Sequence, residues 1–382
     1  MKINNKQIVS NTVLFLGFFL FVLTVQSQQL ETLITEALTN NPEIKKFELR
    51  YNITSEKVNE VNSLPNTEFN VGIMAIAPEM GMPMERFKVS VMQMLPWFGT
   101  ISSRQNYVSS MADAQFVEVT IAKRKLALSV SQFYYLLYEI RAKMEVLDKN
   151  IELLQSYEQL ALTSVEVGKA SAVDVLRLQI RQNELQQEKD VLIQQNKGIQ
   201  AAMNSVMNRE YDNDVSVVSS LEIPEGDIFY DYGGPMIGFG VEYINQENSP
   251  MITSPFKDMV MPMLSASIPI FNKKYKSQTK QNEWQKQEIE AQKKERLNLL
   301  KSELSKAISQ RNQSRIKFNT QQENLKQAKN AETILIKSYE TGTIDFKDVL
   351  DIQELQLKFQ IGQIETVKLY YVQSALINYL SQ

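Results

Sequence analysis

The sequence predicts a mainly α-helical protein with a smaller β component, built from one structural unit that occurs twice. Apolar residues follow a heptad pattern over two very long stretches, and they alternate with polar residues in four short ones. A segment near residue 170 also resembles one near residue 345. The 382 residues include only 13 glycines and 11 prolines. So few turn-forming residues favour long, regular elements.

The first 27 residues predict an export signal. Lys2 and Lys6 give a basic start, and residues 12–25 form an uncharged apolar stretch of 14 residues. That stretch is shorter than a membrane-spanning helix and fits a signal-peptide core, with cleavage before Gln28. The alternative is an uncleaved membrane anchor.

The composition excludes several classes of function. The 41 basic and 44 acidic side chains leave a net charge of −3, so electrostatics give no case for binding nucleic acid. The chain has neither cysteine nor histidine, which removes thiolate and most zinc sites and imidazole-based catalysis. We therefore expect no enzyme activity and no cofactor, although carboxylate catalysis stays a weak alternative. A mean hydropathy of −0.27 also argues against a multi-span helical membrane protein.

The two copies of the unit are related by a constant spacing. Ser164–Gln179 and Ser338–Gln353 are identical at seven positions at an offset of 174. Upstream, Pro96–Gly99 pairs with Pro269–Asn272 at an offset of 173. Two matches in the same order and spacing indicate an internal duplication.

Each copy is predicted to contribute a pair of strands. Apolar residues alternate with polar ones around 69–75, 87–91, 237–243 and 260–268. A period of two marks strands with one apolar and one polar face. The pattern alone is compatible with a half-buried soluble sheet and with the wall of a transmembrane barrel.

After each strand pair the sequence predicts a long helical hairpin. One helix, from about Ser103 to Leu162, would be ~90 Å long. Its apolar residues step by four and three without a break, which is a heptad seam. The heptads are equally typical of a coiled-coil rod and of a stave in a helical barrel. The seam comprises Leu126, Val130, Phe133, Leu137, Ile140, Met144, Leu147, Ile151 and Leu154, and the returning helix adds Leu178, Leu185, Leu192, Ile199 and Val206.

A glycine-centred turn joins the helices of each hairpin. Gly168 and Gly342 suit a tight turn that needs a left-handed residue. Asp174 and Asp348 follow at the start of the next helix, where a carboxylate favours the helix dipole. Capping is therefore the structural interpretation of both aspartates.

This succession of elements resembles the TolC-type outer-membrane efflux proteins. The specific motifs are QMLPWFG at 93–99, SIPIF at 267–271 and two G-x5-D-V-L turns, beginning at Gly168 and Gly342. The resemblance implies that three chains together form one 12-stranded barrel in the outer membrane, with four strands from each chain. It also implies that the long hairpins form a trimeric periplasmic α-barrel.

The resemblance further implies the function. The homotrimer would sit in the outer-membrane lipid of a Gram-negative bacterium and extend into the periplasm. It would be the passive exit duct of a tripartite efflux system for drugs or metal cations. A periplasmic adaptor protein and an inner-membrane efflux pump, of the RND type, would be its partners.

The resemblance also implies which residues at the two turns are functional. The resemblance places a periplasmic gate at the second turn, formed by Tyr339, Asp345, Asp348 and Asp351. Ile344 stands where some members have a gate arginine. The adaptor would contact both tips, at Gly168, Lys169, Asp174, Gly342 and Thr343.

Methionine is concentrated near the predicted strands, which hold 11 of the 16 residues. Thioethers are soft ligands that suit Cu(I) or Ag(I). Apolar filling of strands and loops is the simpler interpretation. The candidate ligands are Met80, Met82, Met84, Met261 and Met263.

The second copy departs from the family pattern. We expect a first repeat over 28–208 (helix, β-hairpin and long α-hairpin), an irregular linker over 209–235 and a second repeat over 236–382 (β-hairpin and long α-hairpin). Residues 30–64 predict an opening helix with a break at Asn41-Pro42, and the second copy has no counterpart. The alternatives to a channel are therefore a degenerate, partly deleted family member and a non-conducting coiled-coil envelope protein.

Overall fold

The computed structural model describes residues 29–73, 87–96, 98–168, 171–224 and 273–381. The predicted signal peptide, the third and fourth strands, Lys169 and the five candidate methionine ligands lie outside these residues. The described chain is mainly helical with few strands, which confirms the predicted mixture of elements.

The chain opens with a broken helix. Residues 29–40 are helical, and α2 (Pro42–Val61) follows after a single residue. Asn41 interrupts the helix because its side-chain oxygen accepts from the Glu43 and Ile44 amides, at 2.8 and 3.3 Å. Pro42 takes the first helical position, where its missing N–H is not needed. The break therefore lies at the predicted Asn-Pro step.

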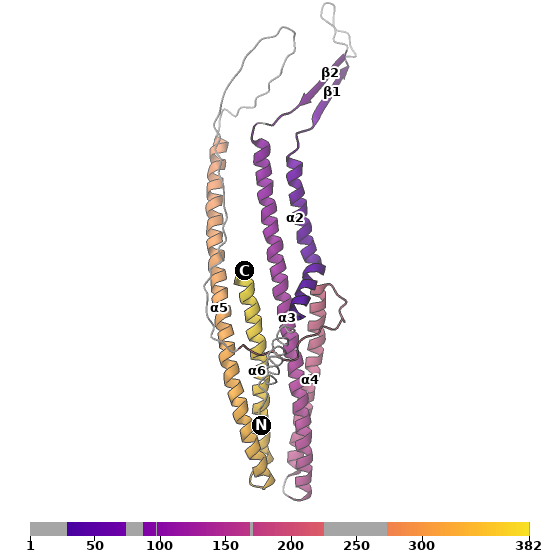
Figure 1. The fold of residues 1–382 in the computed structure, drawn as a ribbon, viewed down its shortest axis with the longest axis vertical. Coiled ribbons are helices and arrows are strands. Elements are labelled where there is room, and N and C mark those ends of the chain that lie inside the picture. Colours follow the sequence, from indigo (N-terminus) through magenta and orange to yellow (C-terminus); the bar gives the residue numbers. More distant parts are fainter. Residues whose placement is uncertain (1–28, 74–86, 97, 169–170, 225–272, 382) are drawn as a thin grey trace, which may run out of the picture.

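Four long helices form two antiparallel hairpins. The first contains α3 (Thr100–Glu166) and α4 (Ala172–Met207), and the second contains α5 (Lys273–Glu340) and α6 (Phe346–Ser381). At 1.5 Å per residue, the 67 residues of α3 span ~100 Å. Both turns lie at one end of the molecule and the strands at the other (Figure 1). None of the helices in the described ranges is long and apolar enough to span a membrane.

The two strands form an antiparallel hairpin. β1 (Thr67–Ile73) pairs with β2 (Phe87–Gln93), and Phe69 lies opposite Val91. Phe69, Val71 and Val91 share one face and are 72, 64 and 60 % exposed. The apolar face of this ribbon is thus not covered by the residues that the structure describes.

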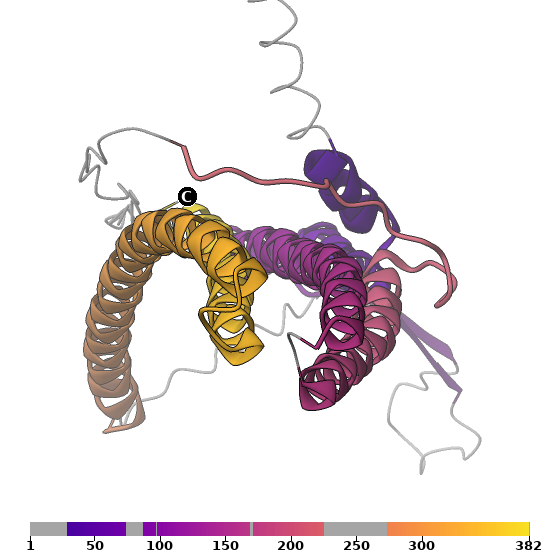
Figure 2. The same ribbon diagram turned by 90° about the horizontal axis from the view of Figure 1, so that it is seen from below.

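The helices pack along two apolar clusters. One cluster runs down the first hairpin to the turns and includes Leu147, Leu185 and Phe346. The other joins the helix at 29–40 to α3 and α4 around Tyr134 and Met203. Because α3 also contacts α6, the two hairpins lie side by side in a curved wall (Figure 2). Every residue of the predicted α3 seam is buried or half-buried.

The described part of the predicted linker, 209–224, crosses the wall as a strap without helix. Tyr134 and Tyr138 of α3 accept from the amides of Val218 and Leu221, each at 3.2 Å. The hydroxyl of Tyr371 on α6 donates to the Glu222 carbonyl at 2.6 Å. The strap therefore ties the first hairpin to the second.

Candidate functional site at the helix turns

Both turns are built around a glycine in the left-handed region. Gly168 has φ +70° and Gly342 has φ +75°. A Cβ at either position would meet no atom within 4 Å, so backbone conformation rather than space requires glycine there. The Gly342 amide donates to the Tyr339 carbonyl at 2.8 Å, and the Thr343 amide donates to that of Ser338 at 3.0 Å. These bonds satisfy carbonyls at the end of α5.

The first turn ends in a capping box. Ser171 Oγ accepts from the Val173 amide at 3.2 Å, and Asp174 Oδ2 accepts from the Ser171 amide at 3.4 Å. Asp174 is only 8 % exposed, and its other oxygen lies 3.5 Å from Arg177 Nη1. Its carboxylate is therefore used within the turn, which matches the capping interpretation.

The second turn leaves its carboxylates exposed. Asp345 directly precedes α6, Asp348 lies in its first turn and Asp351 lies one turn further on. All three side chains are exposed. Asp348 occupies the position of Asp174 in the repeat, but the Asp348 side chain is exposed, whereas the Asp174 side chain is buried in a capping box. The second turn thus presents negative charge that the first turn neutralises internally.

Tyr339 lies apart from these acids, in the interior of the turn. It is 6 % exposed, and its ring packs edge-on against Phe346 with centroids 4.9 Å apart. Phe346 in turn meets Tyr157 of α3 at 5.9 Å. Among the described residues the Tyr339 hydroxyl has no hydrogen-bond partner. The aromatic stack therefore joins the tip of the second hairpin to the first.

A carboxylate clamp closes each hairpin above its turn. In the first, Glu158 accepts from Gln179 Nε2 at 2.7 Å and from Gln182 Nε2 at 2.9 Å. In the second, Glu332 accepts from Gln353 and, at 2.8 Å, from Gln356 Nε2. All three residues recur at the offset of 174. The duplication has therefore preserved a hydrogen-bonded site as well as a fold.

The second clamp has an additional partner on the other hairpin. The hydroxyl of Tyr157 on α3 donates to Glu332 and accepts from Gln353 Nε2 at 3.2 Å. Burial, and then the bond to the Glu332 carboxylate, raise the pKa of Tyr157. The proton therefore stays on the hydroxyl over the physiological range, and the lock between the hairpins is a charge-assisted hydrogen bond.

A groove of about 600 Å³ separates the hairpins near the turns. Leu154, Leu185 and Leu357 contribute to its apolar lining. Arg177 and Arg181 of α4 line it together with Asp351 and Glu354 of α6. The groove therefore combines an apolar lining with charges of both signs.

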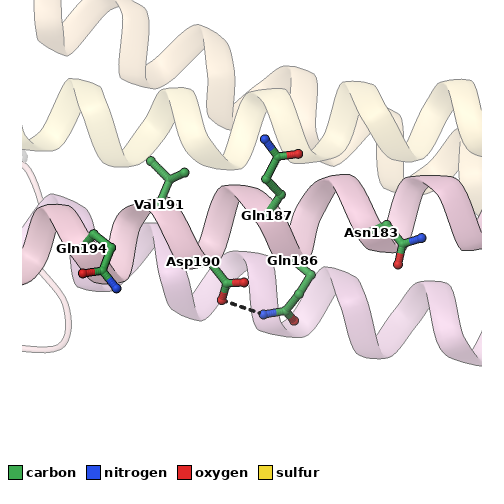
Figure 3. A pocket seen from close by; sticks show the side chains of 6 residues that line it. All are labelled: Asn183, Gln186, Gln187, Asp190, Val191 and Gln194. Carbon is green, nitrogen blue, oxygen red and sulfur yellow. Dashed lines mark hydrogen bonds between the residues drawn. The ribbon is translucent and has the colours of Figure 1, made fainter.

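The outer surface of α4 offers no comparable site. A shallow hollow there is lined by six residues of this single helix, and Gln186 Nε2 donates to Asp190 Oδ1 at 3.0 Å within it (Figure 3). Its lining is mostly amide side chains, with no convergent charges.

The sequence predicted the turns but not the contacts between hairpins. Phe346, Tyr157 and both clamps were not predicted. One signal was available, because Glu158/Glu332 and Gln182/Gln356 are further identities at the offset of 174 that extend the recognised repeat. The role of Tyr157 has no such signal, since its counterpart is Ala331.

No protein-family model matches the sequence, and no curated protein matches it at a significant level. Among solved structures, the outer-membrane protein VceC of Vibrio cholerae aligns with a TM-score of 0.70 and 14 % identity, over 93 % of this chain and 96 % of VceC. The MtrE outer-membrane channel of Neisseria gonorrhoeae aligns with a TM-score of 0.68 and 12 % identity, over 92 and 88 %. The outer-membrane channel OprN aligns with a TM-score of 0.71 and 14 % identity, over 92 and 89 %. The chain therefore has the fold of the TolC-type outer-membrane channels.

Proposed function

We propose that this protein is the outer-membrane channel of a tripartite efflux system, a passive exit duct for drugs or metal cations. The observation that carries the proposal is the fold, which matches outer-membrane channels over 92–93 % of the chain. The protein would catalyse no reaction. Its site of action is the Gram-negative outer membrane, with the helices in the periplasm.

The strands support the proposal of a homotrimer. The apolar residues Phe69, Val71 and Val91 are exposed on the β-hairpin, as expected of a face that meets lipid. Strand edges are not tolerated in lipid, so the four strands that the sequence predicts for each chain would require other chains to close the sheet. Three chains would give the 12-stranded barrel that the family resemblance implies.

The second turn is the proposed gate. In a trimer, Asp345, Asp348 and Asp351 would be repeated three times around one axis. Their exposure in the single chain supports this role, because none of the three is buried in a structural contact. Clustered carboxylates attract cations and repel one another, which favours an open or cation-selective constriction. Tyr339 would act differently, by anchoring the turn through Phe346.

The tips are the proposed contact for a periplasmic adaptor, which an inner-membrane pump of the RND type would join. Gly168, Gly342 and Thr343 form the exposed ends of the hairpins, and the groove behind them has an apolar lining with charges of both signs. An amphipathic helical hairpin would complement that groove. Asp174 would support the contact indirectly, since its carboxylate caps α4.

Ion conduction tests the proposal directly. The full-length protein, extracted from outer membranes, would be reconstituted in planar lipid bilayers. We expect a trimeric mass and a cation-selective current. Asp348→Asn/Asp351→Asn should reduce the preference for cations over anions, because it removes six carboxylates from the trimer axis. Glu188→Gln/Asp190→Asn removes the same charge from the exposed outer surface of α4, away from the groove, and should leave selectivity unchanged.

The outcomes separate the channel from the gate. A soluble rod with no outer-membrane fraction and no current would instead identify a coiled-coil envelope protein. A trimer without current would identify a degenerate member that has lost conduction. If the double variant keeps the cation selectivity of the unmodified protein, the protein is a channel but Asp348 and Asp351 do not form its selective constriction.

A further inference from the structure

We propose that the exposed clamp at Glu158, Gln179 and Gln182 is the docking surface for a second copy of this chain, and that α5 of that copy meets it at Ala331. The contact would lack the tyrosine that locks the hairpins within one chain. It rests on the proposed function, since it requires the copies to assemble in a ring.

The internal repeat supplies the argument for the occupant. Within one chain, the α3 face at Tyr157 meets the clamp of the second hairpin. If first and second hairpins alternate around a ring, each hairpin can contact the next in this way. The second hairpin of one chain would then contact the clamp in the first hairpin of the next chain. In the repeat, Ala331 is equivalent to Tyr157 and Glu158 is equivalent to Glu332, at the offset of 174. The contact between copies therefore pairs Ala331 with the Glu158 clamp.

The two clamps contain the same residue types but differ in how much of their glutamine side chains is exposed. Gln353 and Gln356 are 6 and 4 % exposed. Their counterparts differ, since Gln179 is exposed and Gln182 is half-buried. The second clamp is covered by the neighbouring hairpin of its own chain, whereas the first has no such cover in the described chain. A second copy would cover it in the same way.

The hydrogen-bonding capacity of Glu158 also leaves room for a partner. A carboxylate has about four acceptor positions, and Glu158 uses two of them for Gln179 and Gln182. Glu332 takes a third donor from Tyr157. Ala331 has no hydroxyl to supply that third bond to a neighbouring copy. The interface between copies should therefore open more readily than the interface within a chain.

Disulfide trapping tests the interface, because the chain has no cysteine. Two single-cysteine chains, Glu158→Cys and Ala331→Cys, would be expressed together, so that any bond between these two positions joins different copies. We expect an oxidised dimer of the two variants in outer-membrane extracts. The control replaces Ala331→Cys by Lys329→Cys, an exposed position about 200° around α5. Equal trapping at 329 and 331, or no trapping at 331, would overturn the interface.

The missing lock is tested by adding it. Ala331→Tyr places the absent hydroxyl opposite Glu158, and Ala331→Phe adds the ring alone. In planar bilayers we expect Ala331→Tyr to lower the open probability at least about tenfold relative to Ala331→Phe, since a hydrogen bond to a charged group has that strength. Adding Glu158→Gln to Ala331→Tyr should recover part of the loss. Equal open probabilities for the Tyr and Phe variants would refute the missing-lock proposal.

The two proposals fail separately. Absence of current from every variant, with specific trapping at 331, would refute conduction and retain the interface. Current from the unmodified protein, without specific trapping, would retain the channel and refute the interface.

Discussion

The two helical hairpins have the same length and topology but different seams. In the first, Leu147 and Leu192 are buried in one apolar cluster. At the equivalent positions, 174 residues later, the second has Gln321 and Thr366. The Thr366 hydroxyl shares its hydrogen between the Gly362 carbonyl, at 2.6 Å, and Gln321 Oε1, at 3.1 Å. A buried hydrogen bond adds less net stability than apolar burial of similar area. We therefore expect the apolar seam to stabilise the first hairpin more than the polar positions stabilise the second.

The polar substitutions continue along the second hairpin. Ser314 and Gln373 are almost fully buried there, and their counterparts in the first hairpin are Ile140 and Ile199. The Gln373 side-chain oxygen has no hydrogen-bond partner among the described residues. Partly satisfied polar groups weaken a seam. We therefore expect the seam between α5 and α6 to gain less stability from apolar burial than the seam between α3 and α4 does.

The largest expected effect on stability comes from a change in the apolar seam of the first hairpin. Leu147→Ala should lower the free energy of unfolding by about 3 kcal/mol, because it leaves a cavity in a closely packed seam. The matched change Gln321→Ala should cost about 1 kcal/mol or less, since it removes one hydrogen bond. Denaturant unfolding in detergent measures both. Equal losses would show that the seams do not differ in strength.

Alkaline pH should distinguish the junction between the hairpins from the apolar seam. Burial raises the pKa of Tyr371 to about 12 from its usual 10.0, and Tyr370, Tyr138 and Glu222 add to the shift. Above about pH 10 the unfolded chain loses this proton, whereas the folded chain keeps it until about pH 12. Stability should therefore be complete below pH 10 and fall between about pH 10 and 12.

The measurement is the denaturant midpoint as a function of pH. Tyr371→Phe should make the alkaline decline shallower without abolishing it, because burial also raises the pKa of Tyr134, Tyr135, Tyr138 and Tyr157. It should lower stability below pH 10 as well, because it loses the bond to the Glu222 carbonyl. Leu185→Val, a conservative change in the apolar seam, should lower stability without altering the slope. An unchanged slope for Tyr371→Phe would assign the decline to other groups.

The two turns should differ by a smaller amount. Asp174→Ala removes a capping box and should cost about 1 kcal/mol. Asp348→Ala, at the equivalent position, removes an exposed carboxylate and should cost about 0.5 kcal/mol or less, mainly through the helix dipole. Thermal unfolding of the two variants gives the comparison. A greater loss at Asp348 would mean that its carboxylate has a structural partner in the assembled protein.

The smallest expected effect comes from making the second seam like the first. Gln321→Leu/Thr366→Leu replaces both partners of a buried hydrogen bond by apolar groups, which is close to neutral or stabilising by about 1 kcal/mol. The amides of α6 should then exchange hydrogen more slowly, while those of α4 are unaffected. Faster exchange in α6 would show that Gln321 and Thr366 stabilise the second hairpin.

Much of this fold was predictable because it depends on local patterns. The heptad steps of α3, the Asn41-Pro42 break and the glycine turns each follow from residues close together in the chain. The internal repeat strengthened these predictions, because a helical hairpin and turn predicted in one copy supported the same prediction in the other. The repeated motif that contains Gly342 and Asp348 also located the second turn, whereas the role of its carboxylates as a gate stays a prediction.

The sequence alone determined the helices, their turns and the alternation of the first two strands, because helix and strand periods are properties of successive residues. Only the tertiary structure decided which carboxylates are used internally, that Tyr339 faces the interior, and that Tyr157 bridges to a clamp 175 residues away. Those outcomes depend on how α3 packs against α6, and packing between distant segments leaves no period in the sequence. The two hairpins therefore share their helices and turns, which are local, but differ in burial and hydrogen bonding at equivalent positions, which depend on tertiary packing.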